Sequence, residues 1–312
     1  MSQETKIITI VGGTGFIGRY VVKHLAKAGY RIRVISRNAE SALELKTAGD
    51  PGQILLVSGN VAKPESLQLA ASYAVINLVG ILFESGKQSF NAVQTTGAEK
   101  LAQAAKAAGA QVFVQMSALG ADKASGSHYA RSKLMGEKAV QSAFPTATIL
   151  RPSVVFGEED NFFNQFASMA SFSPALPLIG GGTTKFQPVY VDDVAKAIEA
   201  ALTNKNMRGK TYELGGLGTY SFKEILQFIT ATIHKPRCLT TLPYGLANVV
   251  GFFNELLPRP MITRDQIKLL KHDNVVSENA LTFADIGITP QSVEAIVPHY
   301  LARFAPYLKV AA

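Results

Sequence analysis

Residues 7–18 read Ile-Ile-Thr-Ile-Val-Gly-Gly-Thr-Gly-Phe-Ile-Gly. The stretch opens with an apolar run of strand length, and a helical pattern begins directly after the glycines. Glycines 12, 15 and 18 have the spacing G-x-x-G-x-x-G rather than G-x-G-x-x-G. Glycine permits a tight turn and a close backbone approach to an anion, and the next helix N-terminus offers unpaired N–H groups. The stretch therefore predicts a strand–turn–helix unit that holds a dinucleotide pyrophosphate, the alternative being a glycine-rich turn without a ligand.

The end of the second expected strand indicates which dinucleotide fits. An acidic residue there would accept hydrogen bonds from the ribose 2′-hydroxyl and favour NAD(H). Residues 34–37 instead read Val-Ile-Ser-Arg. Arg37 can pair with a 2′-phosphate, and the Ser36 hydroxyl can donate a hydrogen bond to the same phosphate, which favours NADP(H). The alternative is that Arg37 is only a surface charge. The expected cofactor contacts are Gly12, Thr14, Gly15, Phe16, Ile17, Gly18, Ser36, Arg37, Asn60, Val61, Val79 and Gly80.

The rest of the chain alternates short apolar runs with helical segments, which is typical of a parallel sheet covered on both faces. The expected strands are 7–11, 31–36, 54–58, 74–79, 111–117, 146–150 and 211–214. The expected helices are 17–28, 64–71, 90–108, 129–143, 191–202 and 222–233. The pattern predicts an α/β fold, a Rossmann-type doubly wound parallel sheet with a small α-rich C-terminal lobe. Residues 1–152 would form the nucleotide-binding domain, and 153–312 the remaining sheet elements and the lobe, structurally integrated with it.

Composition excludes several classes of function. The 312 residues are 47% hydrophobic and 17% charged, which provides a buried core and argues against disorder. The single cysteine, Cys238, and histidines without metal-binding spacing predict no metal site. The net charge is +8, but the basic residues are dispersed, which argues against a nucleic-acid partner. With no apolar run of about 18 residues and no secretory signal at residues 1–4, the sequence predicts a cytosol-like compartment.

Tyr129 and Lys133 provide a second signal. They begin and end the string Tyr-Ala-Arg-Ser-Lys after the fifth expected strand, and a spacing of four places both on one helix face. With the glycine spacing and the turn at 77–80, the sequence resembles the extended or atypical short-chain dehydrogenase/reductase superfamily. The resemblance implies that Tyr129 transfers a proton and that Ser117 orients a substrate carbonyl. It also implies that Lys133 contacts the nicotinamide ribose, where a nearby ammonium would lower the pKa of the phenol.

This sequence departs from that superfamily at two places. Residues 118–119 are Ala-Leu, where active members often carry a second Ser or Thr, and Gln94 stands where the active-site Asn is expected. Two interpretations of Tyr129 and Lys133 are therefore open. They form either an acid/base pair or a clamp for a cofactor that is not turned over.

Longer strings at 127–138, 143–160, 187–194 and 261–265 support a closer resemblance. Together they are similar to the nucleotide-binding accessory subunits of respiratory complex I (NADH:ubiquinone oxidoreductase, alpha-subcomplex subunit nine) and their bacterial relatives. The resemblance implies a structural NADPH in an accessory or assembly subunit near the quinone site. Such a subunit is peripheral on the cytoplasmic face of the bacterial inner membrane, or on the matrix side in mitochondria. The alternative is an active NAD(P)H-dependent reductase or epimerase of quinone or sugar-nucleotide metabolism.

An apolar stretch at 242–257 is interrupted only by Asn248, Asn254 and Glu255. Its composition favours a buried helix of the second lobe. The alternative is a surface that contacts lipid or a partner subunit, with the membrane contact running through 242–271. The basic residues that could meet lipid phosphates there are Arg259, Arg264, Lys268 and Lys271.

Overall fold

The computed structural model describes residues 6–86, 88–124, 126–258 and 260–306. Residues 1–4 and Arg259, which figure in the expectations above, lie outside these residues. The chain forms two compact units. Unit 1 comprises the described residues of Met1–Pro152, Val191–Leu214 and Ser277–Ile288, and unit 2 those of Ser153–Tyr190, Gly215–Val276 and Thr289–Ala312.

Unit 1 is built on a seven-stranded, entirely parallel sheet in the order β3-β2-β1-β4-β5-β6-β11. The strands are β1 (Ile7–Val11), β2 (Arg31–Ser36), β3 (Ile54–Ser58), β4 (Ser72–Asn77), β5 (Val112–Met116), β6 (Thr148–Pro152) and β11 (Thr211–Leu214). This order confirms the doubly wound fold, whose ligands bind beyond the carboxyl ends of the strands where the order reverses. Here the reversal lies between β1 and β4. The predicted strands at 74–79, 111–117 and 146–150 have wrong ends, because pairing with neighbours, not composition, sets the bounds.

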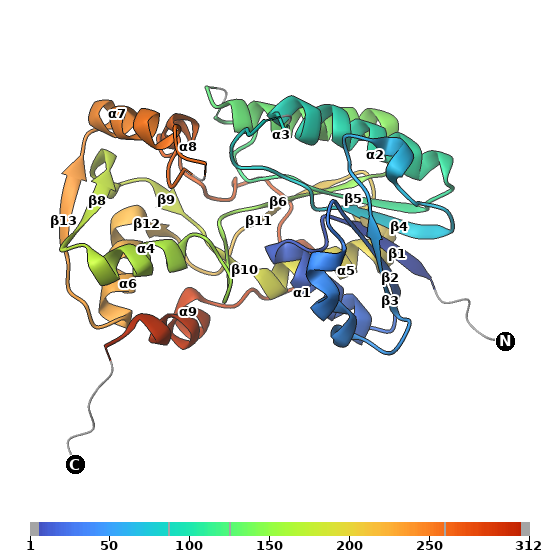
Figure 1. The fold of residues 1–312 in the computed structure, drawn as a ribbon, viewed down its shortest axis with the longest axis horizontal. Helices are drawn as coiled ribbons and strands as arrows, with labels where there is room; N and C mark the ends of the chain where they lie inside the picture. Colours follow the sequence, from blue (N-terminus) through green and yellow to red (C-terminus); the bar gives the residue numbers. More distant parts are fainter. Residues whose placement is uncertain (1–5, 87, 125, 259, 307–312) are drawn as a thin grey trace, which may run out of the picture. The chain divides into compact units, whose positions relative to one another are not determined.

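Four helices cover the two faces of this sheet, as Figure 1 shows. They are α1 (Phe16–Lys27), α2 (Gly97–Ala107), α3 (His128–Ala143) and α5 (Val191–Thr203). Helices α2 and α3 pack together on one face and α1 and α5 on the other. Short helical turns lie at Glu40–Ala48, Pro64–Ser66, Lys205–Met207 and Ala284–Ile286.

Two helix predictions for unit 1 are wrong in part. The segment 64–71 forms only the single turn Pro64–Ser66, because Leu67 is already extended and Ala71 takes a left-handed φ of 59° before β4. The segment 90–108 is interrupted, since Asn91–Thr96 forms a π-helical turn before α2 begins.

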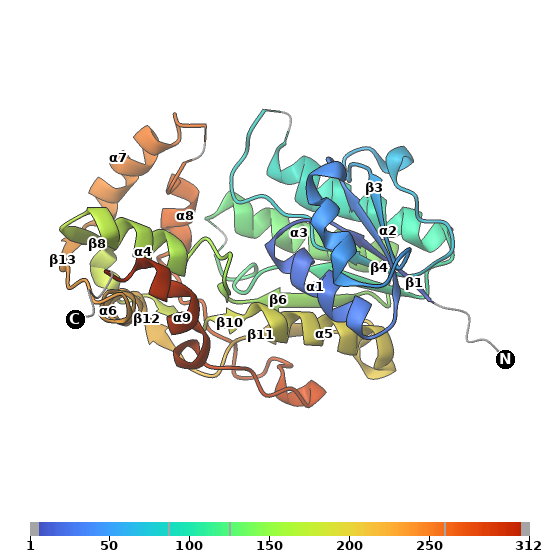
Figure 2. The same ribbon diagram turned by 60° about the horizontal axis from the view of Figure 1, so that its bottom comes forward.

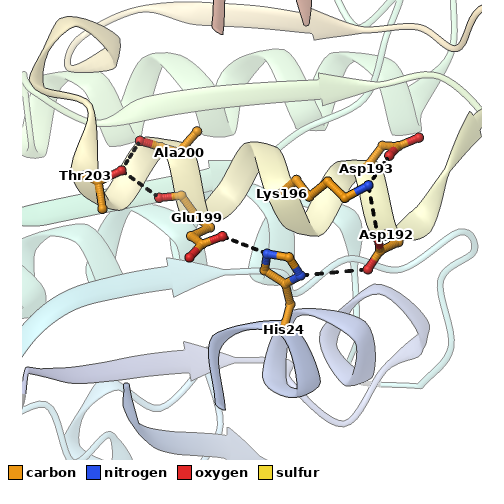
Figure 3. Close-up of polar contacts among 7 residues, drawn as sticks. All are labelled: His24, Asp192, Asp193, Lys196, Glu199, Ala200 and Thr203. Carbon is orange, nitrogen blue, oxygen red and sulfur yellow. Dashed lines mark hydrogen bonds and ion pairs between the residues drawn. The ribbon is translucent and has the colours of Figure 1, made fainter. Parts of the chain in front are cut away.

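Charged side chains join α1 to α5 (Figure 3). His24 of α1 lies 2.7 Å from a Glu199 carboxylate oxygen and 3.8 Å from one of Asp192. Lys196 lies 2.8 Å from Asp193 and 3.3 Å from Asp192. Asp192 and Asp193 therefore act as acidic residues of a first helical turn, where they complement the helix dipole.

Unit 2 has a core of its own. Its helices are α4 (Phe163–Phe172), α6 (Phe222–Thr232), α7 (Tyr244–Asn254), α8 (Arg264–Leu269) and α9 (Val293–Leu301), with a short turn at Ala302–Phe304. Its strands form the pairs β7 (Val155–Phe156) with β10 (Val189–Tyr190), β8 (Ala175–Ile179) with β13 (Cys238–Leu242), and β9 (Lys185–Phe186) with β12 (Tyr220–Ser221). The glycines Gly180–Gly182 form a turn after β8. Helices α4, α6 and α9 lie side by side (Figure 2). Buried phenylalanine, leucine and isoleucine side chains fill the space among them.

Helix α7 is the exception to this burial. Of its residues only Ala247 and Gly251 are buried, and a Cβ on Gly251 would lie 3.0 Å from Ile267 of α8. The large apolar side chains of this segment are exposed, namely Leu246, Val249, Val250, Phe252, Phe253, Leu256 and Leu257. The interpretation of 242–257 as a buried helix is therefore wrong, because the small residues of α7 face its neighbour. No helix in the described part of the chain is long and apolar enough to cross a membrane.

Candidate functional site

The glycine turn after β1 has the backbone that the sequence requires. Gly12 takes a φ of +86° and donates its N–H to the Ile35 carbonyl of β2 at 2.9 Å. A Cβ on Gly12 would lie 3.1 Å from the backbone nitrogen of Val79, so the turn lies directly against the loop after β4. A Cβ on Gly18 would lie 2.5 Å from the Cα of Gly13, so only glycine lets α1 start this close to the turn.

The N-terminus of α1 is open to an anion. Its N-cap residue is Gly15, which has no side chain that could cap the helix, and the first turn contains no acidic side chain. Thr14 lies just before this cap, and Phe16 and Ile17 begin the helix. The first N–H groups of a helix have no intrahelical acceptor and carry a partial positive charge. These N–H groups are therefore available to bind a phosphate.

The polar groups expected at the adenosine end are available for a ligand. Ser36 ends β2, and its buried Oγ has no hydrogen-bond partner among the described residues. Arg37 is exposed, and its guanidinium forms no ion pair within the described ranges. A buried hydroxyl without a partner is costly, and a ligand phosphate or hydroxyl would satisfy it.

The turn after β3 is held by its own side chains. Asn60 Oδ1 accepts a hydrogen bond from the Ala62 N–H at 3.0 Å, which shapes the turn. Val61 is buried, and its methyl groups lie 3.3 and 3.4 Å from where a Cβ on Gly97 would be. Contact of Asn60 and Val61 with an adenine stays a prediction.

The loop after β4 and helix α3 meet at Gly80. A Cβ on Gly80 would lie 3.1 Å from the Lys133 ammonium, so the loop and this side chain are in close contact. Lys133 donates to the Met116 carbonyl at 3.3 Å, at the end of β5. The next residue, Ser117, has a buried Oγ without a partner in the described parts of the chain. The structure therefore brings Val79, Gly80 and Lys133 together beside the glycine turn.

The protonation of Tyr129 differs from the expectation. Burial raises the pKa of its phenol to about 12, and the Lys133 ammonium lies 5.9 Å from its ring centre. The expectation that the ammonium lowers the phenol pKa is therefore wrong, because loss of solvation outweighs that charge. Burial also lowers the pKa of Lys133 to about 8, an effect that the carboxylate of Glu137 opposes. At neutral pH Tyr129 is a proton donor rather than a base.

This buried lysine gives a testable pH dependence. Since its folded pKa of about 8 lies below its ordinary value of 10.5, burial of the ammonium costs stability below pH 8, and stability returns as pH rises toward 10.5. Without nucleotide, Lys133→Met should have a free energy of unfolding at pH 7 that is higher than that of the wild type by up to about 3 kcal/mol. Urea unfolding measures this difference. The difference should shrink at pH 10. A variant less stable than the wild type at pH 7 would contradict this cost.

Two polar clusters behind the site escaped sequence reasoning. In the first, Asn77 Oδ1 accepts from the Val79 N–H at 3.1 Å and its amide donates to Gln115 at 2.9 Å. Gln115 in turn donates to the Met116 carbonyl at 3.0 Å. The two amides are opposite each other in the β4–β5 register, and this pairing cannot be read from either strand alone.

The second cluster surrounds Arg151 of β6. Its guanidinium lies 2.7 Å from carboxylate oxygens of Glu137 and of Asp122, and 3.5 Å from one of Glu213. Glu137 is four residues after Lys133 on α3. The ion pair between Glu137 and Arg151 therefore fixes this helix to the sheet. One signal for this cluster was present in the sequence. Glu213 lies within an expected strand and Arg151 directly follows another, where a buried charge needs a partner. In the structure the two residues lie opposite each other in register.

These features fit a dinucleotide. The uncapped helix end and the glycine turn leave backbone N–H groups that a pyrophosphate could use, Ser36 and Arg37 carry groups that could bind a ribose 2′ substituent, and Lys133 lies against Gly80. The described residues contain no group of three or more His, Cys, Asp or Glu side chains that could hold a metal ion.

Comparisons with known proteins show the family of the chain. The sequence profile of the NAD dependent epimerase/dehydratase family matches residues 8–215. The chain is 38% identical to NADH dehydrogenase (ubiquinone) 1 alpha subcomplex subunit 9, mitochondrial, of Arabidopsis thaliana, over 96% of this chain and 78% of that protein. It is 34% identical to a ceramide reductase of Caulobacter vibrioides over 62% of this chain and 60% of that protein.

A solved structure shares the fold. The dTDP-glucose 4,6-dehydratase DesIV of Streptomyces venezuelae, solved with NAD bound, has a TM-score of 0.71 at 18% identity, covering 96% of each chain. The family profile spans the glycine turn, Tyr129 and Lys133. The chain therefore belongs to the NAD dependent epimerase/dehydratase family, an NAD(P)-binding family of extended short-chain dehydrogenases, and is a homologue of the complex I alpha-subcomplex subunit 9.

Proposed function

We propose that this protein is an accessory or assembly subunit of respiratory complex I that holds NADP(H) mainly as a structural ligand. The observation that carries the proposal is the extent of the similarity to the Arabidopsis thaliana subunit. That similarity covers 96% of this chain and so includes unit 2, whereas the ceramide reductase matches 62%. A fold shared with enzymes does not by itself imply turnover.

The features of the site are compatible with a ligand that is held rather than turned over. The glycine turn leaves backbone N–H groups for a dinucleotide, and the Ser36 and Ser117 hydroxyls are unpartnered among the described residues. Gln94, at the position of the expected active-site Asn, uses its amide to join Ile81 and Ser132. Arg37 and Ser36 favour NADP(H) over NAD(H).

A strain that lacks the gene tests this function. We expect it to lose assembled complex I on native gels, and we expect both the wild-type gene and Tyr129→Phe to restore it. Phe keeps the aromatic ring, which lies 6.0 Å from Phe90, and removes only the hydroxyl that proton transfer would need. Assembly that returns with the wild type but not with Tyr129→Phe would contradict a structural role for the cofactor.

The exposed face of α7 supports a position on the membrane surface, the cytoplasmic face of a bacterial inner membrane or the matrix face in mitochondria. Basic side chains border this apolar face. The Arg264 guanidinium lies 5.1 Å from the ring centre of Phe252 and forms an ion pair with Glu255 at 2.7 Å, and the Lys271 ammonium lies 5.3 Å from the ring centre of Tyr244. An apolar helix face bordered by cations fits an anionic bilayer surface, with the side chains in the acyl boundary and the cations at lipid phosphates.

Removing two of these side chains should release the protein from lipid. Phe253 is 62% and Leu256 73% exposed. Burying each side chain in the bilayer would stabilise the bound state by roughly 1.5–3 kcal/mol. We therefore expect Phe253→Ser with Leu256→Ser to lower the affinity for phosphatidylglycerol vesicles at least about 10-fold. Flotation assays measure this.

The matched control for this prediction is Leu43→Ser with Leu55→Ser, which removes two apolar side chains of similar exposure from unit 1. We expect the control to bind vesicles like the wild type. If all three proteins bound equally, the α7 face would not be the contact.

A second candidate function is an NADP(H)-dependent reductase, which the similarity to the ceramide reductase favours. The bound nicotinamide would supply hydride chemistry. Tyr129, protonated at neutral pH, would give its phenolic proton to a substrate carbonyl oxygen that Ser117 holds, and Lys133 would fix the ribose. NADPH oxidation with a carbonyl substrate that Tyr129→Phe abolishes would establish this function.

A further inference from the structure

A buried glutamine lies between the loop after β4 and helix α3. Gln94 is 2% exposed and belongs to the π-helical turn Asn91–Thr96. Its Nε2 donates to the Ile81 carbonyl at 2.6 Å, and its Oε1 accepts from the Ser132 hydroxyl at 2.8 Å. The Ile81 carbonyl can only accept and the hydroxyl can donate, so the orientation of the amide is fixed.

The two groups that Gln94 joins are neighbours of residues expected to contact the cofactor. Ile81 directly follows Gly80, and Ser132 directly precedes Lys133. A Cβ on Gly80 would lie 3.1 Å from the Lys133 ammonium, so these two segments already touch. Gln94 therefore sets the distance between the loop and the helix from behind the site.

The π-helical turn makes this link possible. A Cβ on Gly136 of α3 would lie 2.0 Å from the Gln94 carbonyl, so the turn and α3 pack backbone against backbone. Thr95 adds a hydrogen bond from its hydroxyl to the Ser132 carbonyl at 3.2 Å. An asparagine at position 94 would be one methylene shorter and could not reach both partners from this backbone. Single π-helical turns often occur at functional sites.

We propose that Gln94 is a positioning residue that slows release of the bound dinucleotide by tying the loop after β4 to α3. Moving Gly80 and Ile81 away from α3 would break the hydrogen bond from Gln94 to the Ile81 carbonyl, while Ser132 keeps the glutamine amide joined to α3. The link holds Gly80 beside Lys133, where the bound dinucleotide is expected, so we expect its loss to change the release rate more than the association rate. This inference rests on the proposed function, in which the cofactor is held.

The experiment measures NADPH release from the full chain by fluorescence after addition of excess NADP⁺. The variants Gln94→Asn and Ser132→Ala each break the link, and Ser132→Ala leaves the buried glutamine in place. The Ser132 hydroxyl also lies 2.7 Å from the Tyr129 carbonyl oxygen, so Ser132→Ala removes that contact too. Since each variant weakens the link itself by about one net hydrogen bond, we expect release to quicken roughly 10-fold and association to change less than about twofold. The double variant should release no faster than either single variant, because both act on one link.

The matched control is Gln103→Asn, which shortens an exposed glutamine on α2. It should release NADPH at the wild-type rate. Wild-type binding with unchanged release rates in both variants, or an equal fall in association, would overturn the positioning role alone. A wild type that binds no NADPH would overturn the proposed function and this inference together.

Discussion

Replacing Gly136 with alanine is expected to destabilise unit 1 by about 3 kcal/mol, the upper part of the range for overpacking. The added methyl group would lie 2.0 Å from the Gln94 carbonyl oxygen, which is backbone and cannot rotate away. Helix α3 must therefore move outward and take Tyr129 and Lys133 with it. A fall of several degrees in the midpoint of thermal unfolding, and weaker NADPH binding, should accompany the substitution.

Gly245→Ala is the control for this prediction. Gly245 is also helical, in α7, and a Cβ there meets nothing within 4 Å. Alanine favours helix over glycine by up to about 1 kcal/mol, so this variant should be as stable as the wild type or slightly more stable. If both alanine variants unfolded at the same temperature, α3 would not be packed against the turn before α2 as described.

Arg37→Glu is expected to weaken NADPH binding roughly 100-fold while leaving NADH binding within a few-fold. A charge-assisted bond to phosphate contributes about 1.5–3 kcal/mol, and a carboxylate at the same place adds repulsion. Its acceptor oxygens would instead suit a ribose 2′-hydroxyl. Titration of the purified protein with each dinucleotide, followed by fluorescence, measures both affinities.

Arg31→Glu separates the local effect from net charge. Arg31 is exposed at the first residue of β2, at the opposite end of the strand from Ser36, and its substitution changes the charge equally. We expect it to leave the ratio of the two affinities unchanged. Equal losses in both variants, or tighter binding of NADH than of NADPH by the wild type, would contradict the assignment of Arg37 to the 2′-phosphate.

The fold was predictable because its signals are local. Each strand of unit 1 is an apolar run between polar turns, so β1, β2, β3 and β11 begin and end at the predicted residues. The turn Gly12–Gly18 was predictable for the same reason, since strand, glycines and helix are contiguous. Where a bound depends on pairing between distant strands, as at the ends of β4, composition gave the wrong residues.

The candidate site was less predictable because it depends on burial and on contacts far apart in sequence. The spacing of Tyr129 and Lys133 gave their common helix face but not the burial that raises the phenol pKa to about 12. The link from Gln94 to Ile81 and Ser132 needs a π-helical turn that no periodicity indicates.

Helix α7 shows a different limit. Its apolar residues occur all round the helix, so periodicity does not say which face is buried. Only the packing of the small residues Ala247 and Gly251 inside unit 2 shows that the large ones are outside. An apolar stretch is therefore as compatible with a membrane or partner surface as with a core, and the neighbours decide.

The most direct test of the central claim is to purify the protein, tagged at its own locus, from membranes solubilised in mild detergent. The proposed function predicts that subunits of complex I co-purify and that the preparation contains NADPH in an amount equimolar to this protein. Extraction and enzymatic assay of the nucleotide measure that amount. Recovery of the protein without complex I subunits, or with them but without any dinucleotide, would contradict the claim that it is a cofactor-bearing subunit of that complex.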